Sequence, residues 1–312
     1  MKIVFFGAGA IGAFYGAMLA RAEAADVWFV ARGAQLAAMR ERGLRIETKY
    51  GDFTLEKPQT TGDTKEIGWA DLVVVSVKEY QTAGILDALT PLVGANTILM
   101  PFQNGVDGDA VLAERFGAER VIGGVPIISV NLIEPGFVRH VASGEIAVGE
   151  FGGNISERVE KIVEAFQKAG IPTQVSTNIR EVLWHKLLWN AGFTSLICLT
   201  GCDSHEIMDV PEACKLVRQA IAETISVGKA QGFNFAPNHL ELIFEGTRAQ
   251  PPIRTSMLFD REAGRPLEYE AITGAVIRHG KYLGVPTPIN DLLYGALKVI
   301  DAHNRRKSAQ NG

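Results

Sequence analysis

The chain has 312 residues, of which 47% are hydrophobic and 21% are charged, and its formal net charge at pH 7 is −4. This is the composition of an ordinary globular protein, and the length suggests about two domains. Nucleic-acid and anionic-membrane surfaces usually require a basic excess, so we expect neither kind of partner.

Three cysteines, Cys198, Cys202 and Cys214, are odd in number and too sparse for a disulfide framework. They lack the paired C-x2-C spacing of a zinc site, so we expect no metal. Glycines from Gly7 onward interrupt the apolar stretch after Lys2, whereas a secretory signal is usually a smoother apolar run. We therefore expect a protein of the reducing cytoplasm.

The first half alternates short apolar runs with helical patterns, which predicts an α/β domain with a mostly parallel sheet. The predicted strands are Lys2 to Phe6, Asp26 to Val30, Leu72 to Val77 and Thr97 to Met100. The predicted helices are Ala10 to Arg21, Tyr80 to Leu89 and Val106 to Phe116.

Two hairpins are predicted beside these elements. One joins Leu44 to Thr48 with Phe53 to Leu55; the other joins Phe137 to His140 with Glu145 to Val148, turning at Ala142-Ser143-Gly144. Asn154 and Glu157 form a capping-box pattern for a helix that continues to Ala169.

After about residue 178 the pattern becomes almost wholly helical. The predicted helices are Ile179 to Thr200, Val210 to Gln231, Asn238 to Glu245, Pro266 to Leu283 and Pro288 to Ala302. We therefore predict an α/β domain over residues 1–172 and an all-helical domain over residues 173–312.

A glycine-rich turn follows the first predicted strand directly and opens the first predicted helix. Its residues are Gly7, Ala8, Gly9, Ala10, Ile11 and Gly12. In this context the first glycine permits a tight turn, the second lets the backbone approach a pyrophosphate, and the third lets the helix pack closely. Free N–H groups at the helix N-terminus would then bind the anion, so the turn predicts a dinucleotide-binding site.

Arg32 follows the second predicted strand, where a NAD-binding protein usually has Asp or Glu on the ribose hydroxyl. A guanidinium can instead pair with a 2′-phosphate through two parallel hydrogen bonds. Arg32 therefore favours NADP over NAD. Lys78 and Asn104 follow the next two strands of the domain, and both are candidates to face the nicotinamide end of the cofactor.

In the helical half, Lys186, Asn190 and Thr194 recur every four residues and should share one helix face. Periodicity alone assigns them no chemistry, because a lysine on a surface helix is usually solvated.

Taken together, these motifs resemble the 2-dehydropantoate 2-reductases, or ketopantoate reductases. The resemblance covers almost the whole chain through the order and spacing of its pieces. They are the turn Gly7 to Gly12, Arg32, Val77-Lys78 with Gln81, Gln103-Asn104-Gly105, Pro135-Gly136 with His140, Trp184 with Lys186-Leu187 and Asn190, Ser256-Met257-Leu258 with Asp260, Gly264-Arg265, Glu268, and Gly284 to Asn290.

The resemblance implies a Rossmann domain followed by an all-helical domain like the C-terminal domain of 6-phosphogluconate dehydrogenase. It also implies hydride transfer from NADPH to the keto carbon of a small 2-keto acid. In the family's mechanism, the residue matching Lys186 is the general acid, and the residue matching Glu268 orients that lysine or the substrate. Those matching Asn190 and Ser256 bind substrate, and those matching Lys78 and Asn104 lie near the nicotinamide and substrate.

The sequence also departs from the family pattern. Thr194 occupies the position of a second asparagine, and Asp203-Ser204-His205 replaces a usual Asn-Gly pair. Threonine retains a hydroxyl group but lacks the reach of an amide. We expect ketopantoate as substrate; the alternatives are another branched or aromatic 2-keto acid and a non-catalytic NADP sensor. A monomer and a homodimer are both compatible with the sequence.

Overall fold

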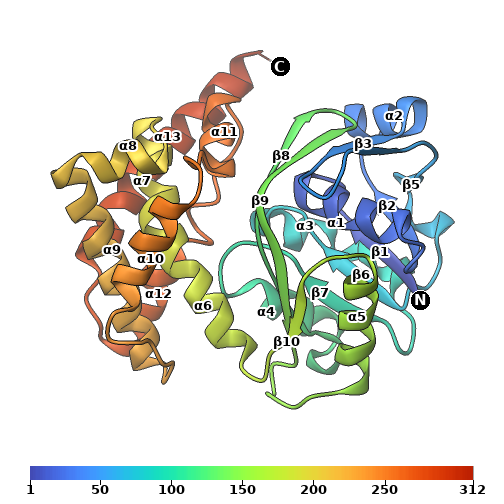
Figure 1. Cartoon of the computed structure of the whole chain (residues 1–312), viewed down its shortest axis with the longest axis horizontal. Coiled ribbons are helices and arrows are strands. Elements are labelled where there is room, and N and C mark those ends of the chain that lie inside the picture. Colours follow the sequence, from blue (N-terminus) through green and yellow to red (C-terminus); the bar gives the residue numbers. More distant parts are fainter. Residues whose placement is uncertain (312) are drawn as a thin grey trace. The chain divides into compact units, whose positions relative to one another are not determined.

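The computed structural model describes residues 1–311, which fold into two compact units (Figure 1). The first unit contains residues 1–103 and 107–182; the second contains residues 104–106 and the described chain from Leu183 onward. The first unit thus includes β10 (Thr173–Val175) and the start of α6 (Ile179–Trp189). The domain boundary at residues 172 and 173 stays a prediction.

The first sheet of the first unit is parallel throughout, with strand order β5-β2-β1-β6-β7. Its strands are β1 (Lys2–Phe6), β2 (Asp26–Val30), β5 (Gln59–Thr61), β6 (Leu72–Val75) and β7 (Ile98–Pro101). β1 and β6 lie in the middle and are almost wholly buried, which explains their nearly unbroken apolar sequences. The parallel sheet expected from the sequence is confirmed; β5, a short polar strand, is an addition.

Each of four α-helices of the first unit follows one of these strands: α1 (Ala10–Arg21) follows β1, α2 (Gly33–Arg42) follows β2, α3 (Thr82–Leu89) follows β6 and α4 (Gly108–Phe116) follows β7. Short 3-10 helices cover Thr64–Glu66, Glu79–Gln81, Thr90–Leu92 and Ala118–Arg120. The bounds of β1, α1 and β2 are those predicted from the sequence, whereas α2 carries too weak an apolar pattern to be recognised there.

A second sheet has strand order β10-β9-β3-β4, with β8 antiparallel to β9. Its further strands are β3 (Leu44–Glu47), β4 (Phe53–Leu55), β8 (Gly123–Glu134) and β9 (Phe137–Gly149). The predicted hairpin of β3 and β4 is confirmed by their antiparallel pairing. The second predicted hairpin is wrong, because 137–149 is one strand and its hairpin partner is β8.

A bulge in β9 explains that error. Ile127 pairs with Glu145 and Ile128 pairs with Ser143, so Gly144 is an extra residue in the strand. Ser143 and Gly144 have φ angles of 62° and 123°, values that are otherwise typical of turns. A bulge and a turn thus leave the same small-residue signature in the sequence.

His140 fixes the backbone of this bulge. Its Nε2 lies 3.1 Å from the carbonyl oxygen of Ala142 and 3.0 Å from that of Ser143, while Nδ1 lies 2.9 Å from Oγ1 of Thr48. These partners fit a neutral ring in which Nε2–H donates and Nδ1 accepts. Burial lowers the pKa of His140, and this outweighs the raising effect of the two carbonyl groups.

α5 (Glu157–Lys168) is capped by Ser156, whose Oγ accepts a hydrogen bond from the Val159 N–H group. The capping box predicted at Asn154 is therefore wrong: the helix begins two residues later than that pattern requires. Gly170, with a φ angle of 73°, follows its C-terminus as predicted.

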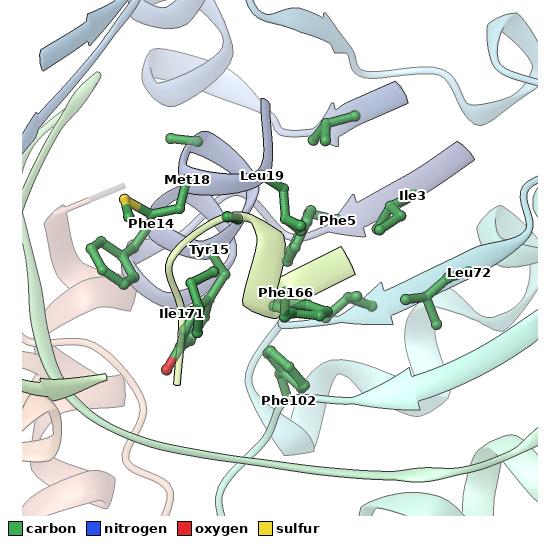
Figure 2. Close-up of a cluster of buried hydrophobic side chains, with 14 of the residues drawn as sticks. Ile3, Phe5, Phe14, Tyr15, Met18, Leu19, Leu72, Phe102, Phe166 and Ile171 are labelled. Carbon is green, nitrogen blue, oxygen red and sulfur yellow. The ribbon is translucent and has the colours of Figure 1, made fainter. Parts of the chain in front are cut away.

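Aromatic side chains join α1, α5 and the end of β7 in the core (Figure 2). The ring centroids of Tyr15 and Phe102 lie 5.6 Å apart, and Phe166 lies 6.3 Å from Tyr15 and 6.1 Å from Phe102. The Tyr15 hydroxyl donates to the Gly144 carbonyl oxygen at 3.2 Å. This packing anchors α1, the helix that follows the glycine-rich turn.

The second unit is built from helices (Figure 1). They are the end of α6, a π-helix over Asn190–Thr194, α7 (Ser195–Thr200), α8 (Ser204–Asp209), α9 (Pro211–Ala230), α10 (His239–Ala249), α11 (Ser256–Glu262), α12 (Thr273–Leu283) and α13 (Pro288–Asn311). The predicted helical domain is confirmed. Within the described residues, none of these helices has the length and hydropathy that a membrane span requires.

Three local predictions for the helical half need correction. The segment from Ile179 to Thr200 contains the π-helix, and α8 and α11 are additional helices. The segment from Pro266 to Leu283 is helical only from Thr273, because the Tyr269 carbonyl oxygen accepts bonds from the beginning of α12. Glu268 therefore lies in an irregular segment, not in the first helical turn.

Candidate active site

The glycine-rich turn has a distinct packing requirement at each glycine. Gly7 has a φ angle of 104°, and a Cβ atom there would lie 2.7 Å from Cγ1 of Val77. A Cβ on Gly12 would lie 2.4 Å from the Gly7 carbonyl oxygen, whereas a Cβ on Gly9 would meet nothing within 4 Å. The turn is thus tightly packed on its protein side and open at Gly9.

The open position coincides with the N-terminus of α1. Gly9 is the N-cap, no side chain caps the helix, and its first turn contains no acidic residue. Ala10 and Ile11, the first two helical residues, are partly exposed, while Ala8 is buried. An uncapped helix N-terminus beside open space fits the pyrophosphate of a dinucleotide.

Two basic residues lie near the carboxyl ends of the parallel strands. Arg32 is exposed at the N-cap of α2, two residues beyond β2. Lys78 is partly buried beyond β6, where it is the N-cap of the 3-10 helix Glu79–Gln81, and its N–H group donates to Oε1 of Gln81 at 3.2 Å. Adjacent parallel strands β2, β1 and β6 bring both residues to the sheet edge that also carries Gly7.

Gln103 also contributes to this sheet edge. Its motif suggested no role for it. It is buried after β7, and its Nε2 donates to the Val77 carbonyl oxygen at 3.0 Å and to Oγ1 of Thr82 at 2.8 Å. These bonds fix the peptide directly before Lys78. The only signal for Gln103 is its place in the Phe-Gln-Asn-Gly segment after an apolar strand.

In the second unit, Asn104 and Glu268 are in contact. The Asn104 Nδ2 atom donates to Oε2 of Glu268 at 3.2 Å, and Glu268 is only 3% exposed. Gly105 makes the approach possible: its φ angle is 93°, and a Cβ there would lie 2.5 Å from the Ala271 carbonyl oxygen. The segment 104–106 therefore packs directly against the irregular segment that carries Glu268.

The next carboxylate along this segment, Glu270, is also held in place. Its Oε1 accepts a hydrogen bond from the Tyr294 hydroxyl at 2.6 Å. This bond is the main cause that raises the pKa of Tyr294 to about 12, so the phenol remains the donor at neutral pH.

Lys186, Asn190 and Thr194 follow one another along α6 and the π-helix. Lys186 is partly buried in the last turn of α6. Asn190 and Thr194 are the first and last residues of the π-helix, and Oγ1 of Thr194 donates to Oδ1 of Asn190 at 3.4 Å. The predicted shared face is thus supported for Asn190 and Thr194 by a direct contact.

Gly192, at the centre of the π-helix, lets this segment approach α9. A Cβ there would lie 2.9 Å from Cγ1 of Ile221 and 3.2 Å from the Val217 carbonyl oxygen. π-helical turns are rare and occur frequently at functional sites. Nothing in the sequence pattern marks this one, since i to i+4 spacing also fits a regular helix.

Ser256 is exposed as the first residue of α11. The loop ahead of it is tied to α8, because Ser204 and Ile253 exchange two hydrogen bonds, at 3.1 Å and 3.0 Å. Asp203 caps α8 by accepting from His205 and Glu206. The departure from the family pattern at residues 203–205 therefore has a structural role in fixing this loop.

Cys198, Cys202 and Cys214 are free thiols. Burial raises the pKa of the Cys198 thiol to about 12, which leaves it protonated and unreactive at neutral pH. Within the described part of the chain, no three His, Cys, Asp or Glu residues are grouped so that they could hold a metal ion.

Comparison with known protein families gives a consistent result for both halves. The profile for ketopantoate reductase PanE/ApbA matches residues 3–153, and the profile for its C-terminal domain matches residues 178–301. The chain belongs to the ketopantoate reductase family. The members of this family are NAD(P)-dependent oxidoreductases with a Rossmann fold, which act on CH–OH groups.

Individual ketopantoate reductases are similar over nearly their whole length. A 2-dehydropantoate 2-reductase of Mesorhizobium japonicum is 33% identical, covering 96% of this chain and 97% of the relative. One from Nostoc sp. is 31% identical, covering 97% of this chain and 96% of the relative. The crystal structure of the Geobacter metallireducens enzyme has 35% identity and a TM-score of 0.92, covering 96% of this chain and 99% of that one.

Proposed function

We propose that this ketopantoate reductase family member reduces 2-dehydropantoate to (R)-pantoate with NADPH, a step of pantothenate biosynthesis, in the cytoplasm. Similarity to 2-dehydropantoate 2-reductases over 96% of the chain carries the proposal. Three free cysteines agree with a reducing compartment.

The residues of the first unit suit NADPH. The open N-terminus of α1, formed by Gly7, Ala8, Gly9, Ala10, Ile11 and Gly12, would bind the pyrophosphate. Arg32 would pair with the 2′-phosphate, and Lys78 would lie towards the nicotinamide. When bound, the cofactor supplies the hydride for the keto carbon.

The residues of the second unit supply the proton and orient the substrate. The ammonium group of Lys186 donates a proton to the substrate oxygen as the carbonyl becomes an alkoxide, and its charge stabilises that alkoxide. Glu268, which accepts a bond from Asn104, orients the lysine or the substrate. Asn104, Asn190, Thr194 and Ser256 would hydrogen-bond the 2-keto acid.

The hydrogen bond between Thr194 and Asn190 supports different roles for the two polar atoms of the Asn190 amide. Because Oδ1 of Asn190 accepts from Thr194, its Nδ2 group is directed elsewhere and can donate to a substrate oxygen. A threonine in place of a second asparagine also leaves more space and fewer donors. This observation favours the second candidate, reduction of another branched or aromatic 2-keto acid.

Steady-state oxidation of NADPH decides among these functions. The purified protein is assayed with ketopantoate beside pyruvate, 2-ketoisovalerate, 2-ketoisocaproate and phenylpyruvate. The proposal expects the highest kcat/KM for ketopantoate. A higher kcat/KM for another acid would reassign the substrate, whereas NADPH binding without turnover of any acid would replace the enzyme by a cofactor sensor.

A further inference from the structure

Glu268 lies in a segment whose position is not set by a helix. Residues 263–272 connect α11 to α12 without regular structure, yet Glu268 is 3% exposed within it. Helical hydrogen bonds would fix a backbone locally; here the backbone around Glu268 is held instead by bonds to the start of α12 and to α13.

The residues directly before and after Glu268 are each held by backbone hydrogen bonds to a neighbouring helix. On the upstream side, the Leu267 N–H group donates to Oδ1 of Asp301 at 2.8 Å. On the downstream side, the Tyr269 carbonyl oxygen accepts from the Gly274 N–H group at 2.9 Å and from Oγ1 of Thr273 at 3.1 Å. The downstream bonds belong to the start of α12, whereas the upstream bond comes from α13.

α13 contacts this segment through one of its faces. Asp301 lies seven residues after Tyr294 and three before Asn304, a spacing that aligns all three side chains. Asn304 Nδ2 donates to the Arg265 carbonyl oxygen at 3.1 Å, and Tyr294 bonds to Glu270. Of the three, Asp301 bonds to the residue directly before Glu268.

Burial of the Asp301 carboxylate carries a desolvation cost in the free energy of folding. Asp301 is 3% exposed, and a buried carboxylate destabilises the fold unless its oxygens have partners. Oδ1 accepts from Leu267, and Oδ2 accepts from Nε of Arg305 at 2.6 Å. A hydrogen bond from an N–H group to a carboxylate is stronger than one to a neutral acceptor, so it holds the Leu267 peptide firmly.

We propose that Asp301 is a positioning residue that sets the place of the Glu268 carboxylate. Loss of its Oδ1 acceptor would leave the buried Leu267 N–H group without this bond and let the peptide move. The carboxylate next to it would shift relative to Asn104. The inference rests on the proposed function in that it gives Glu268 a role in turnover.

Three variants separate positioning from ion pairing. Asp301→Ala removes the acceptor and should lower kcat for ketopantoate about ten- to a hundredfold, because misplacement of a catalytic group by about 1 Å can have that effect. Asp301→Asn retains an acceptor oxygen for Leu267 and should recover most of kcat. Arg305→Gln removes the ion pair with Oδ2 of Asp301 but leaves the Oδ1 acceptor of Leu267 in place, so it should retain the kcat of the unaltered enzyme.

The NADPH dissociation constant and the thermal unfolding midpoint are measured for each variant. Positioning predicts an unchanged dissociation constant in all three. A folded Asp301→Ala protein with unaltered kcat would overturn the inference, and so would an Asp301→Asn protein as impaired as Asp301→Ala. If Asp301→Ala does not fold, Asp301→Ser replaces it, because the serine also removes the carboxylate acceptor but keeps a polar group at this buried position.

A crystal structure of the Asp301→Ala or Asp301→Ser protein tests the inference without activity. Displacement of the Glu268 carboxylate from Asn104 supports it, and an unchanged bond between them contradicts it. Failure of the unaltered protein to reduce any 2-keto acid would instead reject the proposed function, and an unimpaired Glu268→Gln protein would reject the role of Glu268. The crystal structure would still decide the positioning role of Asp301.

Discussion

Asn104 donates its amide to the buried carboxylate of Glu268 across 164 positions of sequence. Removing a donor from a buried carboxylate costs about 1–3 kcal/mol, so we expect Asn104→Ala to lower the free energy of unfolding by that amount and to lower kcat/KM. Urea denaturation and the ketopantoate assay measure both. Asn154→Ala, at an exposed asparagine, is the control, and equal stability of the two variants would contradict the prediction.

Lys186→Ala should lower turnover far more than it weakens NADPH binding. The proton that this lysine donates is needed only as the alkoxide develops, and general acid catalysis contributes about 10²- to 10⁴-fold to a rate. Steady-state kinetics and calorimetric titration with NADPH separate the two effects. Lys215→Ala, at an exposed lysine of α9, serves as the control. Equal losses of affinity and turnover would argue against the proposed role.

Arg32→Ala should raise the apparent KM for NADPH about ten- to a hundredfold, since hydrogen bonds to a charged group contribute about 1.5–3 kcal/mol. The KM for NADH, which lacks the 2′-phosphate, should hardly change. Arg40→Ala removes another exposed arginine from the same helix and controls for net charge. An unchanged preference for NADPH would remove Arg32 from the cofactor site.

Ser156→Ala should lower the free energy of unfolding by about 1 kcal/mol, the usual effect of removing an N-cap. The Ser156 hydroxyl caps α5 and also donates to Oε1 of Glu150 at 2.6 Å. Asn154→Ala should have almost no effect. Thermal or urea unfolding of the two variants compares the Ser156 cap seen in the structure with the Asn154 cap suggested by the sequence. A lower stability of Asn154→Ala than of Ser156→Ala would refute the Ser156 cap.

The stability of the protein should depend on pH through His140. Burial places its pKa in the folded state below the value of 6.5 in the unfolded chain, so the unfolded state binds more protons between these two values. The contribution of His140 to the free energy of unfolding is therefore complete above pH 6.5, and it is lost as the pH falls through the lowered pKa.

Urea unfolding between pH 5 and 8 measures this dependence. The free energy of unfolding should rise with pH more steeply for the natural protein than for His140→Gln, by at most about 1.4 kcal/mol per pH unit. His239, whose pKa is also lowered by burial, contributes equally to both proteins and cancels in the comparison. Parallel profiles would show that His140 does not titrate as expected.

Features with a strong local cause were predictable from the sequence. β1, α1 and β2 have their predicted bounds because an apolar strand, a glycine turn and a second apolar strand each specify their structure locally. The parallel sheet and the helical half follow from the same periodicities. The family resemblance supplied the residues of the candidate site, since periodicity gave Lys186 and Glu268 no chemistry.

Features that depend on distant partners were not predictable. Gly144 looks like a turn residue, and only the pairing of β9 with β8 reveals a bulge. Glu268 lies two residues after Pro266, a good first residue for a helix, yet α12 begins only at Thr273. The bond from Leu267 to Asp301 joins positions 34 residues apart and has no signature in either segment.

The π-helix at Asn190–Thr194 joins α6 to α7 and rotates the side chains of α6 about the helix axis relative to those of α7. A wide turn amounts to one added residue, and each residue of a regular helix corresponds to about 100° of rotation. Deleting one residue within this turn would restore regular winding and rotate Lys186 by about that angle relative to α7. The direction in which Lys186 points is thus set by a count of residues as well as by their identity.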